Sequence, residues 1–130
     1  MANTALQEKA TKKILIIEDE GEMCLLLNIL LDNQDFELDH VKFLSDAKEY
    51  LQKRQPAVII LDNKLPDGFG IDFIGYIKTH YPAIKIIMIT GYDISAKDAA
   101  LETGADIFLA KPFSRDQIYE SIMKMLAEQS

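Results

Sequence analysis

The stretch VIILDNKLPDGFG, residues 58–70, determines how this chain folds. It begins with four consecutive apolar residues, most of them β-branched, and becomes polar at Asp62. Such a short continuous apolar run is typical of a strand buried on both faces of a parallel sheet. The Pro66-Asp67-Gly68 sequence that follows is typical of a turn. The stretch therefore predicts a buried strand that carries a carboxylate to its carboxyl end.

Three further apolar runs of this kind occur, at residues 14–17, 84–89 and 107–110, and they too predict strands buried on both faces. Residues 36–43 alternate apolar and polar side chains, which indicates an edge strand. Between these runs, apolar residues recur at helical spacing. They are Met23, Leu26, Leu27 and Leu30; Ala47, Tyr50 and Leu51; Phe73, Ile74, Ile77 and Tyr81; and Ile118, Ile122 and Met125. Strict alternation of strands and helices predicts an α/β fold with a parallel sheet covered on both faces.

Two helix starts carry capping-box sequences, Ser95 with Asp98 and Ser114 with Gln117. The first of these helices, about residues 95–103, differs from the others in what it offers for packing. Alanine buries little area, so we expect this helix to be held weakly and hypothesise that it is a moving part. Its apolar residues are Ala96, Ala99, Ala100 and Leu101.

Length and composition predict one compact domain over residues 12–130, preceded by a disordered tail at residues 1–11. A net charge of −7 makes direct binding to nucleic acid unfavourable. Cys24 is the only cysteine, which excludes an internal disulfide. The apolar runs are too short to cross a bilayer, and residues 1–13 lack the apolar stretch of a secretory signal. We therefore expect a cytoplasmic protein without membrane contact.

Polar residues follow the predicted strands directly. The first strand is followed by Glu18 and Asp19, and later strands end in Asp62, Thr90 and Lys111. In an open parallel sheet, ligands bind beyond the carboxyl ends of the strands. Several carboxylates a few ångströms apart repel one another, and Lys111 together with a divalent cation would relieve that repulsion. Oxygen ligands with room for water favour Mg²⁺, and the cluster is suited to nucleophilic attack on phosphorus.

Four segments together resemble the receiver domain of bacterial two-component response regulators. They are ILIIEDE (residues 14–20), VIILDNKLPDGFG (58–70), IIMITG (86–91) and LAKPF (109–113). The resemblance covers about residues 12–126 and involves separated positions at the ends of several strands. It implies a five-stranded parallel sheet in the strand order 2-1-3-4-5, the flavodoxin-like (βα)5 arrangement.

The resemblance implies that Asp62 accepts a phosphoryl group from a sensor histidine kinase or a histidine phosphotransfer protein. Asp19 would bind Mg²⁺ (or Mn²⁺) directly, and Glu18 through water. The backbone carbonyl of Lys64 would supply another metal oxygen. The chain would then be a signalling domain that catalyses only its own phosphorylation and dephosphorylation.

Further roles follow from the same resemblance. Thr90 would be the switch hydroxyl, and Lys111 would pair with Asp62 and later with a phosphoryl oxygen. Phe108 occupies the switch-aromatic position, and the Lys111–Pro112 bond is expected to be cis. The output surface would be formed by the predicted fourth helix, fifth strand and fifth helix, in a monomer or weak homodimer. We also hypothesise that Tyr92 shields the phosphoryl group and prolongs the phosphorylated state.

Two enzyme-like or cofactor-binding alternatives fit less well. A haloacid-dehalogenase-type phosphatase would need an Asp-x-Asp sequence after a strand, whereas Gly21 stands two places after Asp19 and Lys64 two places after Asp62. A flavin-binding protein would need a glycine- and hydroxyl-rich phosphate loop, but residues 18–23 are acidic. A receiver scaffold that no longer accepts phosphate is disfavoured because every reactive position is filled. Whether the chain acts alone or within a longer regulator, and which kinase and target it serves, stays open.

Overall fold

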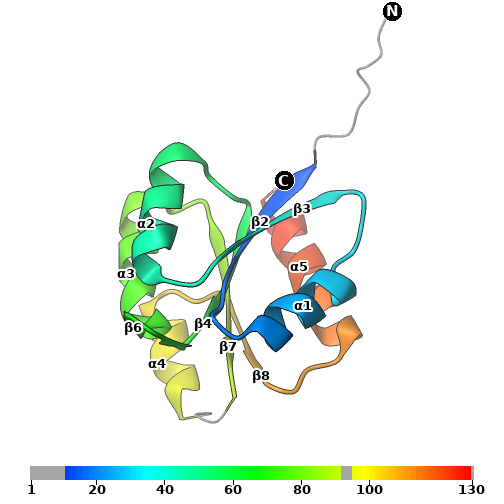
Figure 1. Ribbon diagram of the computed structural model, residues 1–130. Helices are drawn as coiled ribbons and strands as arrows, with labels where there is room; N and C mark the ends of the chain where they lie inside the picture. Colours follow the sequence, from blue (N-terminus) through cyan, green and yellow to red (C-terminus); the bar gives the residue numbers. More distant parts are fainter. Residues whose placement is uncertain (1–10, 92–94, 130) are drawn as a thin grey trace, which may run out of the picture.

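The computed structural model describes residues 11–91 and 95–129 and contains a five-stranded parallel sheet (Figure 1). Its strands are β2 (Lys12–Ile17), β3 (Phe36–Val41), β4 (Val58–Asp62), β7 (Lys85–Thr90) and β8 (Ile107–Ala110). They lie in the order β3-β2-β4-β7-β8, which confirms the expected order 2-1-3-4-5. Residues 1–10 and Tyr92 lie outside the described residues, so the expectations of a disordered tail and a shielding tyrosine stay predictions.

Helices cover both faces of the sheet, as predicted (Figure 1). Their bounds are α1 (Gly21–Leu30), α2 (Leu44–Lys53), α3 (Gly70–His80), α4 (Ala96–Thr103) and α5 (Arg115–Glu128). Helices α2, α3 and α4 lie on one face, and α1 and α5 lie on the other. Among the described residues, no helix has both the length and the apolar character needed to cross a membrane.

The strand side chains divide between two apolar clusters because successive residues of a strand point to opposite faces. In β2, Leu15 and Ile17 pack with α2 and α3, whereas Ile14 and Ile16 pack with α1 and α5. The same alternation runs through β4, whose five residues are all buried. Burial on both faces explains the continuous apolar runs in β2, β4 and β7.

Strand β8 departs from its predicted burial. Residues 107–110 were expected to be buried on both faces, but the strand lies at the edge of the sheet and none of its residues is fully buried. An apolar run has the same composition at an edge as at the centre, so composition alone did not distinguish the two positions. The prediction of a fully buried strand here is wrong.

Helix α1 also buries a different set of residues from the predicted stripe. Leu27 is fully buried, but Leu26 is 39% exposed. Leu31, just beyond the helix, is buried in its place. Leu25 and Ile29 are 63% and 62% exposed, so α1 presents an apolar surface to solvent.

The two predicted capping boxes have different outcomes. At α5, the Ser114 hydroxyl accepts from the backbone N–H of Gln117 at 3.0 Å, and the Gln117 side chain accepts from the Ser114 N–H at 2.8 Å. That capping box is confirmed. At α4, Ser95 occupies the N-cap position without a side-chain capping hydrogen bond, so the second capping box is not formed.

A small hairpin follows β4 directly and was not predicted. It pairs β5 (Lys64–Leu65) with β6 (Gly68–Phe69) in antiparallel register. The Pro66-Asp67 turn between them agrees with the turn chemistry of the sequence. Strands of two residues are too short to produce a recognisable alternation.

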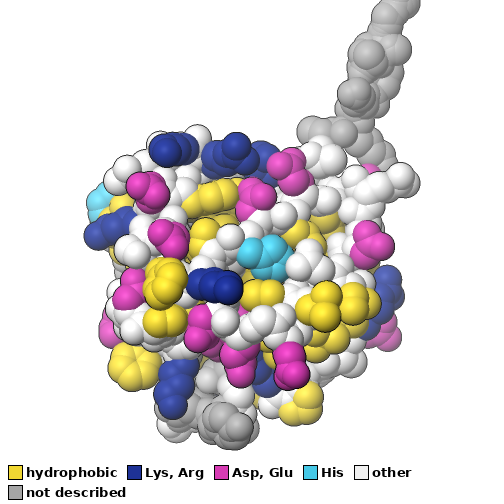
Figure 2. Space-filling model, in the orientation of Figure 1, with side chains coloured by type: hydrophobic (Ala, Val, Ile, Leu, Met, Phe, Trp, Pro, Cys, Tyr) yellow, Lys and Arg dark blue, Asp and Glu magenta, His cyan; other side chains and the backbone are white. Residues whose placement is uncertain are grey.

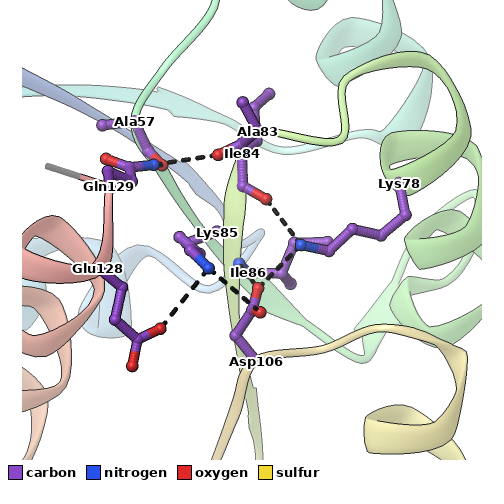
Figure 3. A network of polar contacts seen from close by, with 9 residues as sticks. All are labelled: Ala57, Lys78, Ala83, Ile84, Lys85, Ile86, Asp106, Glu128 and Gln129. Atoms are coloured by element: carbon purple, nitrogen blue, oxygen red, sulfur yellow. Dashed lines mark hydrogen bonds and ion pairs between the residues drawn. The ribbon is translucent and has the colours of Figure 1, made fainter.

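A polar network joins several elements at the amino-terminal end of the sheet, opposite the carboxyl ends of the strands (Figure 3). Asp106 Oδ2 accepts from Lys78 Nζ of α3 at 3.0 Å and from the backbone N–H of Ile86 at 2.8 Å. Lys85 Nζ lies 4.0 Å from the other oxygen of Asp106 and 3.5 Å from Glu128 of α5. The network links α3, β7 and α5 to the segment that enters β8.

Candidate functional site

The predicted site residues meet at the carboxyl edge of the sheet because the strands are parallel. Asp62 is the last residue of β4, and Thr90 is the last residue of β7. Glu18 follows β2 directly, and Lys111 follows β8. The register pairs Asp62 with the residue before Thr90, which brings these two strand ends side by side.

Three carboxylates form the centre of the site. Glu18, Asp19 and Asp62 each offer an oxygen, and these oxygens lie within 4.8 Å of one another. Glu18 and Asp62 are buried, and Asp19 is half-buried. Carboxylates at this separation repel one another when ionised, so the site needs positive charge nearby.

Lys111 supplies positive charge to the cluster. Its Nζ lies 3.1 Å from Glu18 Oε1 and 3.2 Å from Asp62 Oδ1, and the side chain is only 13% exposed. The backbone N–H of Lys111 donates to the Thr90 carbonyl at 2.8 Å, which holds the two strand ends together. The Lys111–Pro112 peptide bond is cis.

Burial and neighbouring charges shift the acid–base properties of the site. Burial raises the pKa of Asp62, and Lys111 only partly offsets that effect. Burial likewise raises the pKa of Glu18. Burial disfavours the charged form of Lys111, but Asp62 and Glu18 outweigh it and raise the pKa of the ammonium group. When both buried acids are ionised, the positive charge of Lys111 does not balance their negative charge.

Glu20 also belongs to the site, a role that the sequence did not indicate. It stands at the N-cap position of α1 without a side-chain capping bond, and its carboxylate lies 3.4 Å from Lys111 Nζ. Its backbone N–H donates to Glu18 Oε2 at 3.1 Å. Both oxygens of Glu18 are thus engaged by the protein, one by Lys111 and the other by this N–H.

The loop after Asp62 is held by hydrogen bonds to both the backbone carbonyl and the side chain of Asn63. The backbone N–H of Gly70 donates to the Asn63 carbonyl at 2.7 Å, and the N–H of Ile71 donates to Asn63 Oδ1 at 2.9 Å. Lys64, which follows, has an exposed side chain. These bonds hold the start of the hairpin that carries the Lys64 carbonyl.

The two predicted switch residues lie in different surroundings. Thr90 is buried at the end of β7. Phe108 is half-buried in β8 and packs against the apolar cluster that includes α3 and α4. Tyr92, the predicted shield, lies outside the described residues.

The surface around the site combines acidic and apolar side chains. Figure 2 shows acidic groups gathered on the lower part of the visible face and an apolar patch beside them, over α1. The exposed apolar residues of α1 are Leu25, Leu26 and Ile29. An apolar surface next to a charged cluster is typical of a protein-binding surface.

The donor set fits a hard divalent cation. Carboxylate oxygens at this spacing, with one ammonium group insufficient to balance them, favour Mg²⁺ over softer metals. A buried carboxylate with a raised pKa beside an ammonium group can also act as a nucleophile toward phosphorus once a cation is bound.

Curated relatives share most of this chain. PilR, a response regulator protein of Pseudomonas aeruginosa, is 31% identical over 88% of this chain, but the chain spans only 26% of that protein. PhoB, a transcriptional regulatory protein of Rhizobium meliloti, is 33% identical, with the chain spanning 52% of it. The sporulation initiation phosphotransferase F of Bacillus subtilis is 28% identical and is spanned over 94% of its length.

Solved structures and a family model agree with these relatives. The beryllofluoride-activated NtrC4 receiver domain is 32% identical over 92% of this chain and all of that chain, with a TM-score of 0.86. A CheY-like receiver domain protein from Methanospirillum hungatei has the same TM-score at 26% identity, covering 92% of this chain and 97% of that one. The response regulator receiver domain model matches residues 14–123. The chain therefore belongs to the receiver-domain family of two-component response regulators.

Proposed function

We propose that Asp62 accepts a phosphoryl group from a phosphohistidine of a sensor histidine kinase or a histidine phosphotransfer protein. The observation that carries this proposal is the contact of 3.2 Å between Lys111 Nζ and Asp62 Oδ1 within a cluster of carboxylates. A buried carboxylate at the end of a central strand, with a cation beside it, is arranged to attack phosphorus. The chemistry of this chain is then limited to its own phosphorylation and dephosphorylation.

In the transfer, one carboxylate oxygen of Asp62 bonds to phosphorus while the bond from phosphorus to the imidazole nitrogen breaks. The electron pair of the broken bond stays on the imidazole, which takes up a proton. Lys111 binds a phosphoryl oxygen, so charge that develops there meets a donor already beside Asp62, and the Thr90 hydroxyl binds a second oxygen after the phosphoryl group has arrived. Burial of Asp62 limits access of water to the acyl phosphate that results.

We assign metal binding to Asp19 and Asp62 directly, together with the backbone carbonyl of Lys64. Glu18 acts through water, because both of its carboxylate oxygens already accept hydrogen bonds from the protein. A bound Mg²⁺ (or Mn²⁺) neutralises charge on the phosphoryl oxygens during transfer. The raised pKa values of Asp62 and Glu18 support this assignment, since a nearby cation favours ionised carboxylates.

Phosphorylation shifts the chain between two conformations. The phosphoryl group adds about −1.5 to −2 charge and three acceptor oxygens, which Thr90 and Lys111 bind. Movement of Thr90 toward the phosphoryl group lets Phe108 turn inward. The surface of α4, β8 and α5 then changes and binds a downstream effector.

The phosphodonor docks over the apolar surface of α1. This helix begins beside Glu20 at the edge of the site, and Leu25 and Ile29 are its most exposed apolar side chains. A donor helix seated there would bury apolar area while it brings its phosphohistidine to Asp62.

Intact mass after incubation with acetyl phosphate tests the proposal. With Mg²⁺, the wild-type chain should gain one phosphoryl group, and EDTA or Asp62→Asn should abolish the gain. Asp106→Asn removes a carboxylate at the opposite end of the sheet and should leave the gain intact. A phosphoryl group retained in Asp62→Asn would contradict the assignment of the acceptor. If the wild type gains none from acetyl phosphate or from phosphorylated histidine kinases, the function is not that of a phosphoacceptor.

A further inference from the structure

The tip of the β5–β6 hairpin is hydrogen-bonded to the first turn of α2, which lies 22 and 23 residues earlier in the chain. The N–H of Leu44 donates to Asp67 Oδ1 at 2.8 Å, and the N–H of Ser45 donates to Oδ2 at 3.0 Å. The first N–H groups of a helix have no partner within the helix. Phe43 stands at the N-cap position and has no side-chain acceptor, so Asp67 caps α2 from another element.

Close packing accompanies these hydrogen bonds. Gly68 has a φ of +149°, and a Cβ at that position would lie 3.1 Å from Leu44 Cδ1. The hairpin backbone therefore passes close beside the side chain that opens α2. The negative charge of Asp67 is also favourable at a helix N-terminus. Hydrogen bonding, packing and charge thus all hold the hairpin tip against α2.

Two anchors consequently define the position of Lys64. On one side, Asn63 accepts hydrogen bonds from the backbone N–H groups of Gly70 and Ile71. On the other side, Asp67 holds the tip of the hairpin to α2. A backbone carbonyl has no rotatable side chain with which to adjust, so its place depends on how the segment that carries it is anchored.

We propose that Asp67 is a positioning residue for the metal site: by capping α2, it sets where the Lys64 carbonyl stands relative to Asp19 and Asp62. The inference rests on the proposed function, which assigns that carbonyl to the metal. It also predicts reciprocity, because binding free energies couple equally in both directions. A bound metal should strengthen the cap of α2, just as the cap strengthens metal binding.

The first test is the affinity for Mg²⁺, measured by isothermal titration calorimetry on three variants. Asp67→Ala should weaken binding by about tenfold, the lower end of the effect of residues that orient metal ligands. Asp67→Asn should bind with an affinity between those of wild type and Asp67→Ala, because its single side-chain oxygen can accept from only one of the two N–H groups and its amide carries no charge. Asn33→Ala is the matched control. It removes the bond from the Asp35 N–H to Asn33 Oδ1 (2.7 Å) at the opposite end of the sheet and should leave the affinity unchanged.

The second test needs no variant. Hydrogen exchange of the Leu44 and Ser45 amides in the wild-type chain should slow when Mg²⁺ is added. The amide of Asp35, which is bound within its own turn by Asn33, should exchange at the same rate with and without the metal. If Asp67 contributed only to folding stability, Mg²⁺ would not slow hydrogen exchange at the Leu44 and Ser45 amides in particular.

The outcomes separate this inference from the proposed function. Equal affinity for Mg²⁺ in Asp67→Ala and wild type, or unchanged exchange at Leu44 and Ser45, overturns the role of Asp67 and leaves the phosphoacceptor assignment standing. A wild-type chain that neither binds Mg²⁺ nor takes a phosphoryl group overturns the proposed function and this inference with it. If Asp67→Ala does not fold, the Mg²⁺ affinity of Asp67→Asn and the exchange measurement on the wild type still test whether Asp67 positions the metal site.

Discussion

The backbone of Gly70 lies so close to Asp62 that a methyl group on Gly70 would overlap the Asp62 carbonyl oxygen. Such a group would also lie 2.9 Å from Leu61 Cγ, in the buried strand that ends at Asp62. The start of α3 is therefore packed directly against the end of β4. This contact, together with the bond from the Gly70 N–H to the Asn63 carbonyl, connects the helix to the site.

Gly70→Ala should destabilise the protein, whereas Gly75→Ala should stabilise it. Overpacking against backbone costs about 1–3 kcal/mol in the free energy of unfolding, and the close contact at Gly70 favours the upper end. Gly75 lies within α3, and a methyl group there would meet no atom of another element within 4 Å. Alanine at that position should therefore add about 0.5–1 kcal/mol through helix propensity. Urea unfolding of both variants measures the difference. Equal effects in the two would show that the contact with Asp62 is not tight.

Asp62→Asn should raise the stability of the metal-free protein at neutral pH. Burial raises the folded-state pKa of Asp62, so the stability that its carboxyl contributes is present below the unfolded-state pKa and is lost as the pH rises through the folded-state pKa. Removing the ionisable group removes that loss. We expect a gain of about 1 kcal/mol at neutral pH, which should shrink as the pH is lowered.

Thermal melts at several pH values, without Mg²⁺, measure this gain. Asp106→Asn is the control, because its carboxylate accepts from Lys78 and from a backbone N–H and its loss should lower stability instead. Added Mg²⁺ should raise the melting temperature of wild type toward that of Asp62→Asn. An Asp62→Asn protein less stable than wild type at neutral pH would contradict the prediction.

Lys111→Met should destabilise the metal-free protein and slow phosphorylation. Removing one partner from a buried ion pair typically costs about 3–5 kcal/mol because the remaining charge is left without compensation. Mg²⁺ should restore much of that stability, since it replaces the lost positive charge beside Asp62 and Glu18. Phosphorylation by acetyl phosphate should remain slower by about 100-fold even with Mg²⁺, because a donor to the phosphoryl oxygens is gone.

Lys85→Met is the matched control for that variant. Lys85 also pairs with two carboxylates, Asp106 and Glu128, but at the opposite end of the sheet (Figure 3). Lys85→Met should lower the free energy of unfolding, and Mg²⁺ should raise it by no more than it does in wild type. Rescue of both variants to the same extent would mean that the metal does not compensate for Lys111 in particular.

The sheet and the strand-end residues of the site could be predicted because each leaves a local signal. A buried parallel strand appears as a continuous apolar run, and a polar residue directly after such a run lies at the carboxyl edge. Asp62, Thr90 and Lys111 all follow this pattern. Glu20 left no such signal, because its contact with Lys111 joins residues that lie 91 positions apart.

The capping of α2 by Asp67 could not be predicted for the same reason. The sequence identifies Pro66-Asp67-Gly68 as a turn, but the acceptor and its donors belong to different elements. The edge position of β8 was likewise hidden, since its apolar run resembles those of the central strands. Pairings between distant elements depend on the assembled fold, and local sequence patterns do not contain them.

Helix α4 should exchange its backbone amides faster than the other helices. Within its eight residues only Ala100 is buried, and Leu101 is 37% exposed, so little apolar area holds it to the sheet. Helix α5 is the internal control, because it has a complete capping box and buries Ile118, Ile122 and Met125. Local opening follows the amount of buried apolar contact, so the amides of α4 should be among the least protected.

Hydrogen exchange followed by mass spectrometry measures this difference in the wild-type chain. Phosphorylation with acetyl phosphate and Mg²⁺ should then change the exchange of α4 more than that of α5, if α4 is the weakly held part that the proposed switch moves. Asp62→Asn under the same conditions should show no change in either helix. An α4 as strongly protected as β2 and β4 would mean that it opens only with the whole domain, and the switch would then have to act through side-chain movement alone.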